Sequence, residues 1–157
     1  MDAPGPGPTA VGMAELVDLL ESSNDLAFIF DVSGRIRWAN AAARAFARID
    51  GVDALAERPH LLRAFVTPAS RERNLPVALA QLAQHGSWTG EIDGLRPDGS
   101  TAPLSISVIA HRRPDGTVDS CSAIARDISA ARAVVQTLGA NEQRMRTLVD
   151  SAPIGIF

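Results

Sequence analysis

The chain has 157 residues, a length that fits one domain with some chain left over. Hydrophobic residues make up 46% and charged residues 21%, and 15 basic against 18 acidic residues give a formal charge of −3. This composition is typical of a soluble globular protein and argues against a basic surface for nucleic acid. Because no apolar run approaches the roughly 18 residues of a membrane span, we expect no direct membrane insertion.

The single cysteine, Cys121, excludes a disulfide within the chain and a cysteine-rich metal site. The start, "MDAPGPGPTA", has neither the basic nor the apolar segment of a signal peptide. We therefore expect a cytoplasmic protein in a reducing compartment, without a bound metal.

Two segments precede the first predicted strand. Residues 1–10 alternate Pro and Gly, which predicts a disordered tail. In residues 11–22, "VGMAELVDLLES", apolar side chains recur at helical intervals and predict an amphipathic helix.

The next stretch predicts a β-hairpin followed by a helix. "LAFIFD" is a short apolar run, "VSG" a turn, and "RIRWAN" alternates, which predicts that Ile36 and Trp38 share one face. Asn40 then stands before an Ala-rich run, where it predicts a helix N-cap.

A helical insert separates this hairpin from the rest of the chain. Residues 50–73 are expected to be irregular, with Pro68 as one of the interruptions. Residues 75–86 predict a helix, with Leu75, Leu79 and Leu82 on its apolar face and a glycine stop at its end.

From residue 87 the apolar period changes to two, and two Pro-Asp-Gly turns divide the chain into three strands. In the middle strand Leu104, Ile106 and Val108 share one face. The order predicts an α+β fold in which helices cover one face of a five-stranded antiparallel sheet. The other face then needs the N-terminal helix or a second molecule.

Three segments together resemble the PAS family of sensory domains: "FIFDVSGRIRWANAAARAF", "GSWTGEIDGLRPDGS" and "RRPDGTVDSCSAIARDIS". The resemblance implies a PAS domain over residues 23–128. Asp127, Ile128 and Ser129 stand in the place of the family's Asp-Ile-Thr signature. By this resemblance they are expected to transmit a signal to the helix that follows.

That helix is predicted over residues 129–150, where apolar side chains follow heptad spacing. A parallel dimeric connector is expected, which makes the protein a homodimer; a helix packed on its own domain is the alternative. The residues expected in the dimer seam are Ala131, Val135, Leu138 and Met145.

The resemblance also implies a cavity between the helical insert and the sheet. An apolar cavity would suit a small apolar ligand, and a filled core that only dimerises is the alternative. The candidate wall residues are Phe30, Trp38, Phe46, His60, Leu61, Phe65, Leu79, Trp88, Ile106 and Ala123.

No coloured cofactor is expected. Haem-binding relatives take a histidine from the helical region that holds His60, but nothing near it marks a haem site. Flavin-adduct relatives need a helical Asn-Cys-Arg motif, whereas Cys121 lies on the last strand. For a non-covalent flavin, Trp88 could supply a stacking ring, although core packing is the stronger expectation.

The sequence shows no phosphate-binding loop, metalloprotease motif or nucleophilic triad, so no catalytic residue is expected. The predicted function is a sensory input module that acts on downstream domains of its own chain. The output would be a histidine kinase of a two-component system or a cyclic-dinucleotide enzyme. A ligand-free dimerisation and interaction module is the alternative.

The last residues repeat an earlier pattern. "LVDSAPIGIF" aligns with "LLESSNDLAF" without a gap, after a helix and before a strand in both copies. Residues 151–157 are therefore predicted to begin a second, truncated PAS domain.

Overall fold

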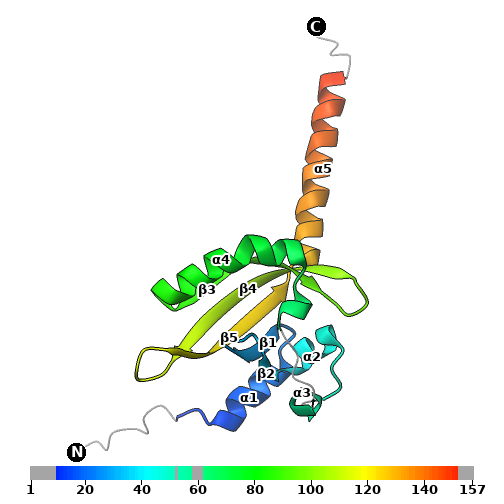
Figure 1. Ribbon diagram of the computed structural model, residues 1–157. Coiled ribbons are helices and arrows are strands. Elements are labelled where there is room, and N and C mark those ends of the chain that lie inside the picture. Colours follow the sequence, from blue (N-terminus) through cyan, green and yellow to red (C-terminus); the bar gives the residue numbers. More distant parts are fainter. Residues whose placement is uncertain (1–9, 52, 58–61, 152–157) are drawn as a thin grey trace, which may run out of the picture.

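A computed structural model of the chain describes residues 10–51, 53–57 and 62–151 (Figure 1). A five-stranded antiparallel sheet in the order β2-β1-β5-β4-β3 forms its centre, so the predicted α+β fold is confirmed. The elements in chain order are α1 (Met13–Ser22), β1 (Leu26–Asp31), β2 (Ile36–Ala39), α2 (Ala41–Ala47), α3 (Asp53–Glu57), the 3-10 helix η1 (Leu62–Phe65), α4 (Pro68–His85), β3 (Ser87–Leu95), β4 (Thr101–Arg112), β5 (Val118–Asp127) and α5 (Ser129–Ser151).

The sheet has an inner face that carries the core and an outer face that does not. Alternate residues of β4 point to opposite faces, so Leu104 and Val108 are buried while Ile109 is 52% exposed. The helical insert covers the inner face, because Ala43 of α2 and Ala78 of α4 belong to the same buried cluster as Leu104. The predicted inner face of β4 is therefore confirmed.

The predicted pairing of Ile36 with Trp38 on one face is wrong. Phe30 of β1 lies opposite Ile36 and Ile29 lies opposite Trp38, so the register shifts between these two pairs. This bulge in β2 places one extra residue in the strand. Ile36 therefore stays on the inner face at 7% exposure, while Trp38 turns to the outer face.

Helix α4 begins seven residues earlier than the sequence suggests. The Thr67 side chain accepts a hydrogen bond from the Ser70 amide and caps the helix, and Pro68 occupies its first turn. Proline is favoured there because the missing amide hydrogen would have had no partner in the helix. The predicted interruption at Pro68 is therefore wrong, since this proline starts the helix.

The predicted core-facing side of α4 is wrong for two of its three leucines, because only Leu82 packs against the core. Leu75 and Leu79 are 48% and 58% exposed, whereas Ser70 and Ala78 are buried. The buried residues stand eight apart and lie on one stripe of the helix. Small side chains on that stripe let α4 lie close to β3, where Ser70 Oγ accepts a hydrogen bond from the Asp93 amide at 2.9 Å.

The two terminal helices add no buried residue to this core. Helix α1 has no buried residue, and α5 rises away from the sheet as a separate rod (orange to red in Figure 1). Ser151 ends α5, and the predicted start of a second domain otherwise lies outside the described residues, as does the predicted tail except for its last residue.

Candidate functional site: an apolar cavity and an exit helix

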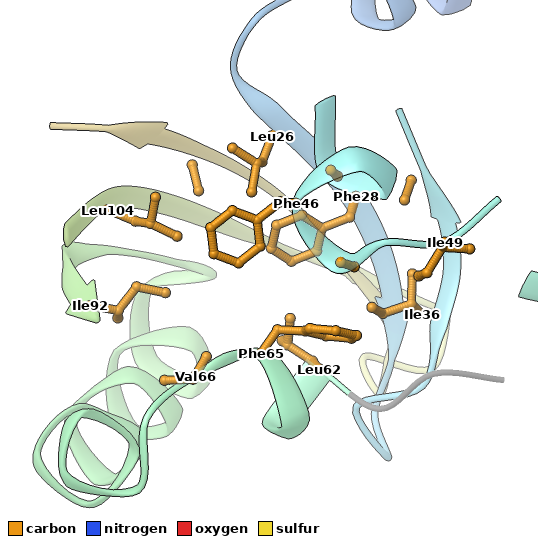
Figure 2. A pocket seen from close by; sticks show the side chains of 14 residues that line it. Leu26, Phe28, Ile36, Phe46, Ile49, Leu62, Phe65, Val66, Ile92 and Leu104 are labelled. Atoms are coloured by element: carbon orange, nitrogen blue, oxygen red, sulfur yellow. The ribbon is translucent and has the colours of Figure 1, made fainter. Parts of the chain in front are cut away.

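A small cavity lies between the inner face of the sheet and the helical insert. Its volume is about 40 Å³, and Figure 2 shows the labelled side chains converging on it from both sides. Every lining residue described is apolar. The wall consists of Leu26, Phe28, Ile36, Ala39, Ala43, Phe46, Ala47, Ile49, Leu62, Phe65, Val66, Ile92, Leu104 and Ala125.

Two of the predicted wall residues, Phe46 and Phe65, lie in this wall. Trp88, Ile106 and Ala123 are buried in the core but are not among the residues that line the cavity.

The remaining candidates lie elsewhere. Phe30 packs against the core from a partly buried position. Trp38 lies on the outer face and Leu79 on the exposed side of α4, for the reasons given above. His60 and Leu61 lie outside the described residues.

Sequence reasoning missed most of the wall, although a signal existed for part of it. Leu26 and Phe28 alternate with Phe30 along β1, and Leu104 shares its face with Ile106. Period-two patterning therefore could have placed Leu26, Phe28 and Leu104 on the inner face. The wall residues from η1 and its flank, such as Val66, carried no periodic pattern.

Gly94 allows Phe46 and Leu104 to lie close to the backbone of β3. A Cβ atom at this position would lie 2.7 Å from Leu104 Cδ1 and 2.8 Å from Phe46 Cζ. Such distances are well inside ordinary van der Waals contact. Only glycine therefore allows Phe46 to pack directly against β3.

The described wall does not fit haem or flavin. A cavity of about 40 Å³ is far smaller than the roughly 300–1,000 Å³ of typical cofactor and drug sites. None of its described side chains offers a hydrogen bond to the polar edge of a flavin ring or a ligand to iron. No group of three or more His, Cys, Asp or Glu side chains in the described segments is arranged to hold a metal ion.

Cys121 lies on the inner face of β5 and is buried. Burial raises the pKa of its thiol, because the thiolate loses its hydration. A protonated thiol in the core is a poor nucleophile and a poor metal ligand.

Asn40 joins the N-terminal helix to the domain. Its side chain is fully buried, and Oδ1 accepts hydrogen bonds from the amides of Ala27 and Ala43, both at 3.0 Å. Its Nδ2 donates to the carbonyls of Leu20 at 2.7 Å and Asp25 at 2.9 Å. The predicted N-cap is confirmed, and the same residue also holds the end of α1 against β1.

The exit helix begins at a cap supplied by the last strand. Asp127 Oδ1 accepts a hydrogen bond from the Ser129 amide at 2.8 Å. The hydrogen bonds from Ser129 lower the pKa of Asp127, and Arg96 adds a smaller effect in the same direction. The Ile128 amide donates to the Pro103 carbonyl at 3.0 Å, so the start of α5 is fastened to β4 as well.

An ion pair between Arg132 and Glu91 of β3 is a further tie between α5 and the domain. All side chains described from 129 to 149 are exposed. The exposed apolar ones include the predicted seam residues Val135, Leu138 and Met145, at 63–68%.

A family model for the PAS fold matches residues 20–133 of the chain. The chain belongs to the PAS family. PAS domains act as sensory and signalling modules. In this chain Asp127 is the last residue of β5, and its side chain caps α5. A search among the curated proteins found no match.

Solved structures share the fold at low sequence identity. The PAS domain of a protein from Colwellia psychrerythraea superposes with a TM-score of 0.66 and 18% identity, over 75% of this chain and 98% of that one. A sensory box histidine kinase/response regulator from Burkholderia thailandensis gives 0.61 and 14%, over 85% and 98%. A light-oxygen-voltage domain studied with a flavin analogue gives 0.58 and 18%, over 82% and 98%.

In the part of the chain that the structure describes, no helix combines the length and the apolar character needed to cross a bilayer.

Proposed function

We propose that this PAS domain is an input module that reports the state of its cavity to a downstream domain through α5. One observation carries the proposal: the last strand of the sheet caps a 23-residue helix that leaves the domain with all its described side chains exposed. An isolated helix of this kind gains most of its stability from packing, so it needs a partner. The partner would be the same helix of a second copy, in register along the seam at Val135, Leu138 and Met145.

The proposed stimulus is a compact, uncharged apolar molecule in the inner cavity. A volume of about 40 Å³ is room for about three water molecules, and an apolar wall gives water no hydrogen bonds. A ligand of a few heavy atoms therefore fits better than a charged metabolite. Filling the space would add van der Waals contacts that the wall now lacks.

The proposed output is a histidine kinase or a cyclic-dinucleotide enzyme in the same chain. The Burkholderia structure comes from a protein described as a histidine kinase and response regulator, which supports this class of output. We place the module in the cytoplasm, in keeping with a single, buried, unpaired cysteine.

Xenon under pressure tests the cavity directly, since it fills small apolar cavities. In the full chain we expect the methyl resonances of Leu104 and Ile92 to shift, with those of Ile109 on the outer face as the internal control. An organic extract analysed by mass spectrometry and an absorption spectrum would show what the protein carries from the cell. A flavin or haem band, or methyl groups in the wall that do not respond to xenon, would overturn the proposed ligand class.

A ligand-free dimerisation module is the second candidate, and the outer face of the sheet favours it. A groove of about 190 Å³ runs over this face, lined by Trp38, Ile109 and Ile124 among others. The two isoleucines are 52% and 47% exposed, and Leu20 of α1 also lines the groove. This candidate predicts a stable dimer whose cavity takes up neither xenon nor a cellular molecule.

The second candidate assigns the outer face to a second copy of the chain. Helix α1 exposes Met13 and Leu19 at 76% and 67%, so each copy has an uncovered apolar helix and an uncovered apolar sheet face. A two-fold axis would let each helix cover the sheet face of the other copy.

A further inference from the structure

The C-terminal end of α2 is fastened to the β3–β4 hairpin at two points. The guanidinium carbon of Arg96 lies 4.9 Å from the centre of the Phe46 ring, a cation–π contact. Arg48, which ends α2 in the left-handed conformation, donates to Asp98 in the hairpin turn at 2.9 Å. A displacement of this end of α2 therefore has to move the hairpin or break these contacts.

Phe46 is also enclosed on several sides. Its ring and the side chain of Leu104 both line the cavity. Both also lie within 3 Å of the position that a Cβ atom would take at Gly94, so the Phe46 ring packs closely against Leu104 and the backbone of Gly94. On the other side it meets Arg96. A molecule that enters the cavity and pushes on this ring therefore pushes on the arginine.

Arg96 faces the exit helix at the same time. Its Nη2 lies 3.9 Å from Asp127 Oδ2, while Nη1 donates to Ser100 Oγ at 3.3 Å. A fully formed guanidinium–carboxylate hydrogen bond measures about 2.7–2.9 Å. Arg96 is thus held between two partners and is only partly engaged with the carboxylate that caps α5.

We propose that Arg96 couples the cavity to α5, because its guanidinium group interacts with both the Phe46 ring and the Asp127 carboxylate. When the ring is displaced, the guanidinium loses its aromatic partner and closes on Asp127. The strengthened cap then stabilises the first turn of α5. This inference gives a mechanism for the signalling function proposed above and rests on it, but the variants below test it without a ligand.

The test is amide hydrogen exchange of the full chain, read at the first turn of α5. The Arg132 amide, which donates to the Ile128 carbonyl at 2.9 Å, reports that turn. Phe46→Leu, which removes the ring, should slow its exchange by roughly two- to fivefold, the equivalent of an exposed cation–π contact. Phe28→Leu is the matched control, because it also replaces a phenylalanine of the cavity wall by leucine, but on β1.

Arg96→Gln removes the coupling residue. In that background Phe46→Leu should leave the exchange of the Arg132 amide unchanged. Equal effects of Phe46→Leu and Phe28→Leu, or a Phe46→Leu effect that survives Arg96→Gln, would overturn the proposal. If Phe46→Leu fails to fold, Phe46→Met makes the same test with less loss of volume.

Xenon separates this proposal from the proposed function. Pressure of xenon on the wild-type chain should slow exchange of the same amide, and Arg96→Gln should abolish that response. If the Leu104 methyl groups do not respond to xenon, the ligand class fails while the variants still decide the role of Arg96. If xenon enters and the amide does not respond, the coupling through Arg96 is wrong.

Discussion

The two faces of the sheet are built from the same strands and differ in what covers them. On β4, Leu104 is 3% exposed under the helical insert, while Ile109, five residues on, is 52% exposed. The inner face is complete within one chain and leaves a cavity of only about 40 Å³. The outer face has apolar side chains of similar size but no element of its own chain over most of them. The proposed ligand would therefore bind on the inner face, and the proposed second copy would contact the outer face, α1 and α5.

Substitution on either face of β4 gives the largest expected contrast. Leu104→Ala removes a buried side chain and should lower the free energy of unfolding by about 2–5 kcal/mol. Ile109→Ala should change it by about 0.5 kcal/mol or less at concentrations where the chain is monomeric. Urea unfolding of both variants measures the difference. Equal losses would mean that the two faces are equally covered.

A pair of glycine substitutions compares the packed domain with the exposed helix. Gly94→Ala should destabilise the domain by about 1–3 kcal/mol, because its Cβ would overlap Leu104 and Phe46. Gly139→Ala in α5 meets no atom within 4 Å and should stabilise that helix by up to about 1 kcal/mol. Thermal unfolding followed by circular dichroism reports both. A stabilising Gly94→Ala would show that Phe46 does not pack on β3 as described.

The smallest expected effect concerns acid and the cap of α5. The pKa of Asp127 is lowered in the folded state, so its contribution to stability is present above the unfolded pKa of about 3.9 and is lost as pH falls through the folded pKa. Asp127→Asn should therefore cost more stability at pH 6 than at pH 2.

Because Asp127 is 44% exposed, solvent screening keeps this effect small. Urea unfolding at the two pH values measures it. Glu142→Gln, which removes a carboxylate from the middle of the same helix, is the control. A cost of Asp127→Asn that stays constant from pH 6 to pH 2 would contradict a charged cap.

The same contrast explains what the sequence could predict. The alternation of apolar residues identified the inner face of β4, because successive side chains of a regular strand point to opposite faces of the sheet. It failed at Trp38, where a bulge in β2 reverses the face without any mark in the apolar pattern. Helical periodicity failed at Leu79, because leucines on α4 look like a core stripe while the buried stripe is made of Ser70 and Ala78.

The cavity wall was the least predictable part. It brings together Val66, Ile92 and Leu104 from three separate segments, and their approach depends on Gly94 and on the short contact of α4 with β3. Local patterns carry no information about such distances. The cap at Asp127 was predictable, because it needs only a carboxylate two residues before the amide that donates the hydrogen bond.

We expect a second copy of the chain to complete the module through its outer face and α5. Sedimentation equilibrium of the full chain tests it most directly, with Ile109→Glu on the outer face, Leu138→Glu on α5 and Leu79→Glu on the exposed side of α4 as the control. A dimer is expected for the wild type and the control, with weaker association for both test variants. A monomeric wild type, or a dimer that both test variants leave unchanged, would contradict it.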